Sequence, residues 1–316
     1  MKKHKSTYAA RRELRFRSLP PEDVALLDPM VQHIVEQNRL LVSVAKDQQL
    51  KVTSSQSLLE KSLGPQEAHP LYTRICLSKD WDERRETLMA VRQRKLKSAY
   101  DFLMAPGRFV DPDKPHVSDH RFETSEGDIC CVHSEATHFR GVQSLEKVWE
   151  AVLFHYNNIE IDISERLGHT TVRDDYDSID GSVSNIRILS HSESCIAVES
   201  SIVTFSQLFF ESDDEFNRQP VGILALDCID EDELYPYFPD KRVRLDTSGA
   251  IVLTVSKKND SGAGGMVVTL RRAAFVKLHN PVFPISEVTR QELQTGIGRW
   301  GDVLMKTIRS YVYGNP

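Results

Sequence analysis

Apolar residues recur at helical spacing in the first part of the chain. From residue 29 to residue 59 they return three and four positions apart, as in the seam of a coiled coil. Gln48 and Ser55 interrupt this seam. The pattern therefore leaves two interpretations open for residues 29–62, an amphipathic helix packed on its own domain and a short coiled coil that forms a homodimer.

A second helix is predicted to begin at Asp80, because Asp80 and Glu83 form a capping-box-like pair, and to end before Pro106. Leu88 and Phe102 belong to its apolar stripe. Basic residues crowd its other faces and are expected to lie in solvent: Arg84, Arg85, Arg92, Arg94, Lys95 and Lys97. A shorter amphipathic helix is predicted after Ser144, whose side chain can cap it.

Extended segments dominate the second half of the chain. Strands joined by a turn at 126–128 are predicted within residues 120–138. After a polar passage through residues 168–181, further strands are predicted at 183–190, 195–210, 221–228, 250–256 and 266–278. These segments are β-branched, partly alternating and separated by turn-rich loops, which favours an antiparallel sheet.

The last predicted element is a long amphipathic helix that begins at Ser286. Its apolar residues recur at helical spacing: Leu293, Ile297, Trp300, Leu304, Ile308 and Val312. Three glycines at 296, 298 and 301 lower its helix propensity by about 1 kcal/mol each, so packing must hold it in place. Close approach of the helix backbone to the sheet would explain these glycines. The predicted fold class is α+β.

Composition and charge narrow the class of protein. The chain has 316 residues, 40% of them hydrophobic and 27% charged, which is ordinary globular usage. Its net charge of −6 argues against nucleic-acid binding by the whole surface. The five cysteines include no CxxC pair, and no apolar run is long enough to span a membrane. We therefore expect a cytoplasmic protein, with a nuclear location left open.

The N-terminal segment is basic. Residues 1–17 carry seven Lys or Arg against one Glu, and Pro20 and Pro21 interrupt any helix that continues from them. Residues 1–28 are predicted to be a disordered arm and residues 63–70 a linker to a domain at 71–316. Sequence-specific DNA binding is not expected, because the arm lacks the Asn and paired Ala residues of a basic zipper.

Catalytic signatures fail on spacing or context. The glycine-rich run at 261–265 lies between two predicted strands, and the chain has no Gly-x-Ser-x-Gly elbow. The pairs His116/His120 and His133/His138 lie in a loop and on a strand, which does not suit metal ligands. The acidic run at 227–233 is interpreted as an edge guard, a partner patch or a loop near a cavity mouth. The sequence thus predicts a protein that is not an enzyme and has no cofactor or metal.

Several stretches resemble one family. They are Asp80-Trp-Asp-Glu-Arg-Arg-Glu-Thr-Leu88, Gly127-Asp-Ile-Cys-Cys131, Gly222-Ile-Leu-Ala-Leu-Asp227, Asp230-Glu-Asp-Glu-Leu-Tyr-Pro236 and Trp300-Gly-Asp-Val303. They are similar to START-like (StAR-related lipid-transfer) proteins of the oomycete group, which often carry a coiled-coil or basic-zipper-like segment first. The resemblance covers about residues 71–313. It implies a helix-grip fold, in which a curved antiparallel sheet and the C-terminal helix enclose a cavity for an apolar ligand.

This resemblance yields the functional hypothesis, which is non-catalytic binding of a lipid or other small apolar ligand. The predicted cavity wall and lid are Phe205, Val252, Phe275, Ile297, Trp300 and Leu304, with Glu199 and Arg271 as inward polar groups. For any single one of the apolar residues, the pattern favours plain core. The alternative function is a dimeric regulatory or interaction protein that uses the 29–62 helix, with the START-like part as scaffold or sensor.

Overall fold

The chain separates into two compact units, Met1–Pro65 and Gln66–Pro316. The computed structural model describes residues of the second unit: 69–106, 108–109, 114–179, 181–191, 196–210, 219–257, 266–297 and 299–314. The predicted basic arm, the 29–62 helix and most of the linker lie outside the described residues. They stay predictions.

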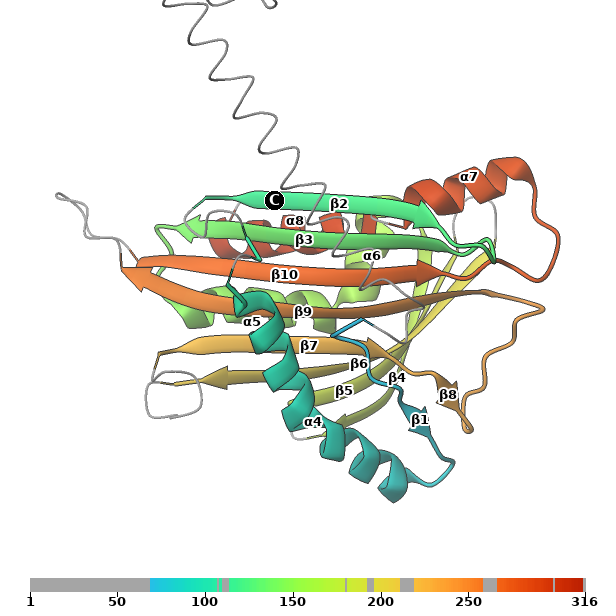
Figure 1. Cartoon of the computed structure of the whole chain (residues 1–316), viewed down its shortest axis with the longest axis horizontal. Coiled ribbons are helices and arrows are strands. Elements are labelled where there is room, and N and C mark those ends of the chain that lie inside the picture. Colours follow the sequence, from blue (N-terminus) through green and yellow to red (C-terminus); the bar gives the residue numbers. More distant parts are fainter. Residues whose placement is uncertain are drawn as a thin grey trace, which may run out of the picture. The chain divides into compact units, whose positions relative to one another are not determined.

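An eight-stranded sheet forms the body of the second unit, in the order β2-β3-β10-β9-β7-β6-β5-β4 (Figure 1). Its strands are β2 (His116–Glu123), β3 (Ile129–Arg140), β4 (Thr170–Ile179), β5 (Val183–His191), β6 (Ala197–Phe209), β7 (Val221–Cys228), β9 (Val243–Lys257) and β10 (Met266–Leu278). Neighbouring strands are antiparallel, as predicted, and β6 and β9 add a short parallel pairing. A separate parallel pair joins β1 (Cys76–Leu77) to β8 (Glu231–Asp232).

Five helices accompany the sheet: α4 (Trp81–Met104), α5 (Leu145–Asn157), α6 (Ile159–Leu167), α7 (Glu287–Gly296) and α8 (Arg299–Tyr313). The predicted helix starts are confirmed, because Asp80, Ser144 and Ser286 each accept hydrogen bonds from backbone N–H groups of the first turn. The short helix α6 was not predicted. No described helix is long and apolar enough to cross a membrane.

The helices cover the two faces of the sheet separately. Helix α4 packs on β6, β7, β9 and β10 and lies in front of the sheet in Figure 1, whereas α5 and α8 lie behind it. Residues of α5 and α8 form one core with alternate residues of β7, β9 and β10, such as Leu224, Ile251 and Leu270. We call the face toward α5, α6 and α8 the inner face, and the face toward α4 the outer face. This is the helix-grip arrangement of an α+β fold.

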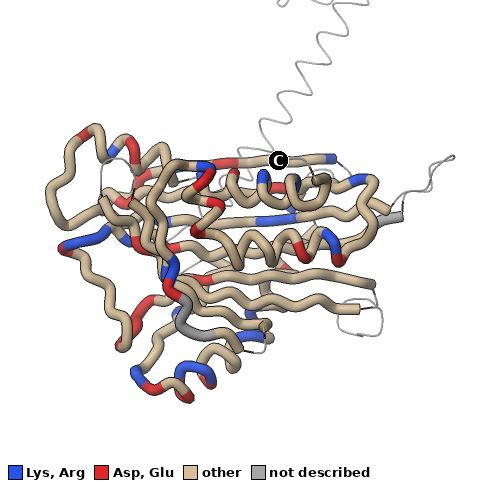
Figure 2. The backbone as a smooth tube through the Cα atoms, turned by 180° about the vertical axis from the view of Figure 1, so that it is seen from behind, with Lys and Arg blue, Asp and Glu red and all other residues tan. Residues whose placement is uncertain are grey.

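Two buried ion pairs hold α4 on the outer face, which corrects the expectation that its basic residues lie in solvent. Arg84 binds Asp232 with two hydrogen bonds of 2.8 and 2.9 Å, and Lys95 binds Asp227 at 2.6 Å. Arg84 is 1% exposed and Lys95 3%. Sequence periodicity missed them because their partners lie 148 and 132 positions further along the chain. Figure 2 shows the charges of both signs where α4, β1 and β8 come together.

The C-terminal helical segment is divided into α7, which ends at Gly296, and α8, which begins at Arg299. The expected close approach holds at Gly301, where a Cβ would lie 3.3 Å from a guanidinium nitrogen of Arg272 on β10. It does not hold at Gly296, where a Cβ would have nothing within 4 Å. Gly298 lies outside the described residues.

Candidate ligand site

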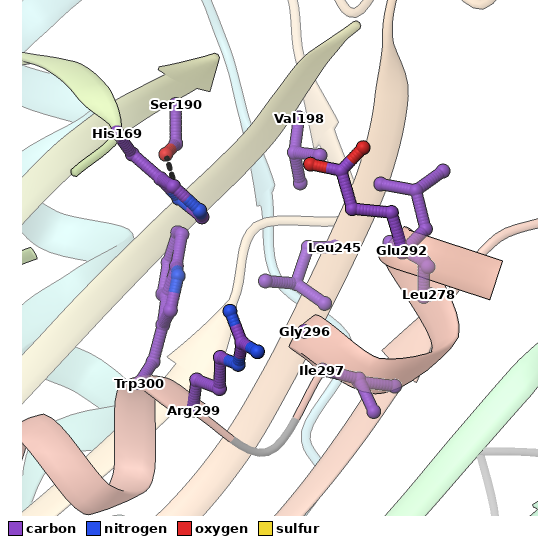
Figure 3. Close-up of a pocket in the computed structure, with 11 residues that line it drawn as sticks. His169, Ser190, Val198, Leu245, Leu278, Glu292, Gly296, Ile297, Arg299 and Trp300 are labelled. Atoms are coloured by element: carbon purple, nitrogen blue, oxygen red, sulfur yellow. Dashed lines mark hydrogen bonds between the residues drawn. The ribbon is translucent and has the colours of Figure 1, made fainter. Parts of the chain in front are cut away.

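A small cavity lies between the inner face of the sheet and the junction of α7 with α8 (Figure 3). Its volume is about 60 Å³. It is lined by His169, Ser190, Val198, Leu245, Leu278, Glu292, Leu293, Gly296, Ile297, Arg299 and Trp300. The sheet thus forms its floor, and the two C-terminal helices form its cover.

The walls of the cavity continue into an apolar cluster beneath α7. Leu245 of β9 and Leu278 of β10 pack there with Leu293 and Ile297, which are buried where α7 ends. Trp300, at the start of α8, is partly buried and also contacts a second cluster that α6 shares with β5 and β6. Leu245 and Leu278 point toward the inner face, because the side chains of a strand alternate between the two faces of a sheet.

Polar groups stand at the rim of this apolar space. His169 precedes β4, and its Nδ1 lies 3.2 Å from the Oγ of Ser190 on β5. Arg299 and Glu292 reach the rim from α8 and α7, on opposite sides of the cavity in Figure 3. Neither of these two has an ion-pair or hydrogen-bond partner among the described residues.

A buried ionic network fixes the start of α8 beside the cavity. Arg272 of β10 donates from Nε to Glu135 of β3 at 2.8 Å and from Nη1 to the carbonyl oxygen of Gly301 at 2.9 Å. Its Nη2 lies 2.9 Å from Nε2 of His133. Burial alone would raise the pKa of Glu135, but the hydrogen bond with His133 and the charge of Arg272 outweigh it and lower that pKa to about 2.

The structure distributes the eight predicted site residues over three places. Ile297 and Trp300 line the cavity. Leu304 lies in the neighbouring core with α5. The remaining five lie on strands with their side chains toward the outer face, away from this cavity: Glu199, Phe205, Val252, Arg271 and Phe275.

Contacts and register both assign these five residues to the outer face. Phe275 stacks on His69 with ring centroids 4.1 Å apart and meets Phe102 of α4 edge-on. Val252 lies between Ile251 and Leu253, which both belong to the inner core with α5 and α8. Strand alternation therefore turns Val252 to the opposite face, and the same holds for Arg271, because its neighbour Arg272 reaches Gly301.

The physical reason for this shift is that both faces of the sheet are covered. In a strand such as β7, the residues that face the inner face and those that face the outer face are all buried. The apolar pattern of the sequence therefore does not indicate which set faces the C-terminal helices. Phe205, for example, is fully buried, although the inward residue nearest the cavity on its strand is Val198. Sequence reasoning missed His169 and Ser190 because it interpreted the segment that contains β4 as a polar passage.

A second hollow, of about 410 Å³, lies on the outer face around β8 and includes the acidic run. Most of its carboxylates are already bound within the domain. Asp230 accepts from Tyr72 at 2.7 Å, Asp232 binds Arg84, and Glu199 binds Arg242 at 2.6 Å. Asp246 binds Arg244 and His279. This pairing explains the acidic run as part of the contact that holds α4 and the segment before it.

Comparison with known proteins gives only distant structural likenesses. No family model and no curated protein matches the chain. Human STARD10 aligns with 69% of this chain and 80% of its own at 9% identity and a TM-score of 0.35. Ara h 8.0201 aligns with 58% and 99% at 11% identity and a TM-score of 0.26. The di-domain ARO/CYC BexL from the BE-7585A biosynthetic pathway aligns with 75% and 63% at 10% identity and a TM-score of 0.30.

Likenesses this distant do not identify a ligand for this chain. The helix-grip fold is assigned from its own strand order, its two covered faces and its C-terminal helices. The chemistry that the cavity offers is apolar contact, a histidine–serine hydrogen bond and two unpaired charges at the rim. Among the described residues, no group of His, Cys, Asp and Glu is placed to hold a metal ion.

Proposed function

We propose that this domain binds a small apolar or lipid-like ligand, without catalysis, between the inner face of the sheet and the α7–α8 segment. The observation that supports this most is the position of the cavity. It lies beneath the joint between two helices, where an apolar cluster is covered by a helix that buries only Thr289 and Leu293 of its own ten residues.

The ligand needs more room than the closed cavity offers. Pockets for small molecules usually have volumes of about 300–1,000 Å³, whereas this cavity has about 60 Å³. Outward movement of α7 would uncover Leu245, Leu278 and the residues around them, which together form an apolar cup. Each methylene of a ligand that lies on this cup beneath α7 gains about 0.8 kcal/mol on leaving water.

Helix α8 is much more firmly attached than α7. It buries Val303, Leu304, Met305, Thr307 and Ile308, and Arg272 binds its backbone at Gly301. Helix α7 ends at Gly296, before the first of these contacts, so α7 can move without breaking them. In the proposed mechanism, α7 is the lid of the cavity and α8 is part of its wall.

Native mass spectrometry tests the proposal directly. Protein purified from cells without detergent is expected to carry a co-purifying apolar molecule, identified by lipid extraction. A Val198→Phe substitution fills the cavity and should remove most of the bound molecule. Val172→Phe is the matched control, because Val172 is 51% exposed on β4, at the edge of the same sheet.

Equal ligand occupancy in wild type, Val198→Phe and Val172→Phe would contradict binding at this cavity. Failure of the wild type to bind any member of a panel of fatty acids, sterols and phospholipids would contradict the function itself. Melting temperatures of both variants show whether lost binding is lost folding. The alternative dimeric role depends on residues 29–62, which lie outside the described residues, and it stays a prediction.

A further inference from the structure

Two opposite charges at the rim of the cavity have no ion-pair partner in the part of the chain that the structure describes, and they belong to different helices. Arg299 belongs to α8 and Glu292 to α7. Apart from these two residues and His169, the only polar side-chain groups of the described lining are the hydroxyl of Ser190 and the indole N–H of Trp300. The head of a bound amphiphile therefore meets these rim groups first.

Opening of the lid separates the two charges. Glu292 is next to Leu293, a buried residue of α7, so any movement of α7 that uncovers the cup carries this carboxylate away. Arg299 lies two residues before Gly301, whose carbonyl oxygen is bound by the buried Arg272. Arg299 therefore stays at the cavity when Glu292 leaves, and the loaded cavity has a positively charged rim.

We propose that the ligand is an anionic amphiphile, and that Arg299 binds its carboxylate at the rim while the apolar chain lies on the cup beneath α7. This inference rests on the proposed function and specifies the ligand class. A guanidinium and a carboxylate form short, parallel, charge-assisted hydrogen bonds, which a neutral head group cannot match. A cationic head group would be repelled by the same residue.

Three single-chain probes of equal length test this inference: dodecanoate, dodecanol and dodecyltrimethylammonium. Titration calorimetry of the full-length protein, below the micelle concentration of each probe, gives the dissociation constants. We expect the order of affinity dodecanoate, dodecanol, dodecyltrimethylammonium. Arg299→Gln should weaken dodecanoate binding about tenfold, as expected for loss of a hydrogen bond to a charged group, and should leave dodecanol binding unchanged.

Glu292→Gln is the control, because it removes the negative charge at the rim instead of the positive one. That negative charge would repel a carboxylate, so the substitution should leave dodecanoate binding unchanged or strengthen it. Both residues lie at the rim without partners among the described residues, so neither change disturbs a fold contact.

Two results would overturn the inference in distinguishable ways. If dodecanoate and dodecanol bind equally well and Arg299→Gln affects neither, the proposed function stands and the anionic ligand class is wrong. If none of the three probes binds and no other apolar molecule does, the proposed function fails and this inference fails with it.

Discussion

Lys95 and Asp227 form an ion pair with almost no contact with solvent, at 3% and 0% exposure. Asp227 also accepts hydrogen bonds from the backbone N–H of Thr73 and from Ser248. Burial raises the pKa of Asp227, and the nearby Lys95 offsets part of that rise. The pair therefore joins α4, the segment before β1 and the end of β7 at one point.

Removing one partner of this pair should be costly. Lys95→Met leaves the carboxylate of Asp227 buried without its counter-ion, so the free energy of unfolding should fall by about 3–5 kcal/mol in urea denaturation. Lys97→Met, at an exposed position of the same helix, should change it by less than about 0.5 kcal/mol. Equal effects of the two substitutions would show that the pair contributes nothing specific.

Glu135 gives the domain a defined acid sensitivity. Its folded-state pKa is about 2, below the ordinary value of 4.5. Because the folded state favours the ionised carboxylate, this contribution is fully present above about pH 4.5 and is lost as the pH falls toward 2. Urea unfolding at a series of pH values should show Glu135→Gln clearly less stable than wild type at pH 7, with the difference shrinking at about pH 3.

A matched variant isolates the network around Arg272 from general acid effects. Glu123→Gln lies at an exposed position of β2 and should follow the wild-type pH dependence. A Glu135→Gln variant that runs parallel to wild type across the acid range would contradict the role assigned to this carboxylate.

At the scale of elements, two glycines of the C-terminal segment should respond oppositely to alanine. Gly296 has open space at its Cβ position, so Gly296→Ala should stabilise the domain by up to about 1 kcal/mol through helix propensity. Gly301 faces the guanidinium of Arg272, which Glu135 and His133 hold in place. Gly301→Ala should therefore destabilise the domain. If it stabilised the domain as much as Gly296→Ala does, the side chain of Arg272 would have to move aside easily.

Helix α7 should also differ from α8 in hydrogen exchange. Its amides should exchange earlier than those of α8, because it buries fewer side chains and lacks a contact like that of Arg272 with Gly301. A bound amphiphile should slow exchange in α7 and leave α8 unchanged. Protection of α7 equal to that of α8, with no ligand response, would indicate a closed core instead of a lid.

The sequence predicts those elements whose signals are local. Capping residues gave the starts of α4, α5 and α7, and β-branched alternation gave most of the sheet. It missed β4, whose sequence is polar, and β1 and β8, which are two residues long. The division between α7 and α8 was also missed, because the apolar spacing continues across it. Two residues that line the cavity, Ile297 and Trp300, were among those predicted for the ligand site, because the predicted C-terminal helix has one apolar stripe.

At the scale of the whole domain, residues before α4 belong to the fold. Leu71, Ile75 and Leu77 are buried, and the carbonyl oxygen of Leu71 accepts a hydrogen bond from Lys95. A chain that begins at Gln66 should unfold cooperatively. One that begins at Ser78 should lose several kcal/mol of stability, because it lacks both this apolar surface and a backbone partner of Asp227. Denaturant unfolding of the two truncated chains measures the difference, and equal stability would place the domain boundary at α4.

The hydrogen bond from Arg272 to the backbone of Gly301 affects which properties of the protein a substitution can alter. Under the proposed function, it separates the residues that keep the domain folded from the residues that would control how long a ligand stays bound. Substitutions at exposed positions of α7, such as Val288, should alter the release rate while the melting temperature stays nearly constant. Substitutions around Arg272 should lower the melting temperature and leave the release rate nearly unchanged. Ligand residence time and thermal stability are then two independently adjustable properties of one helical segment.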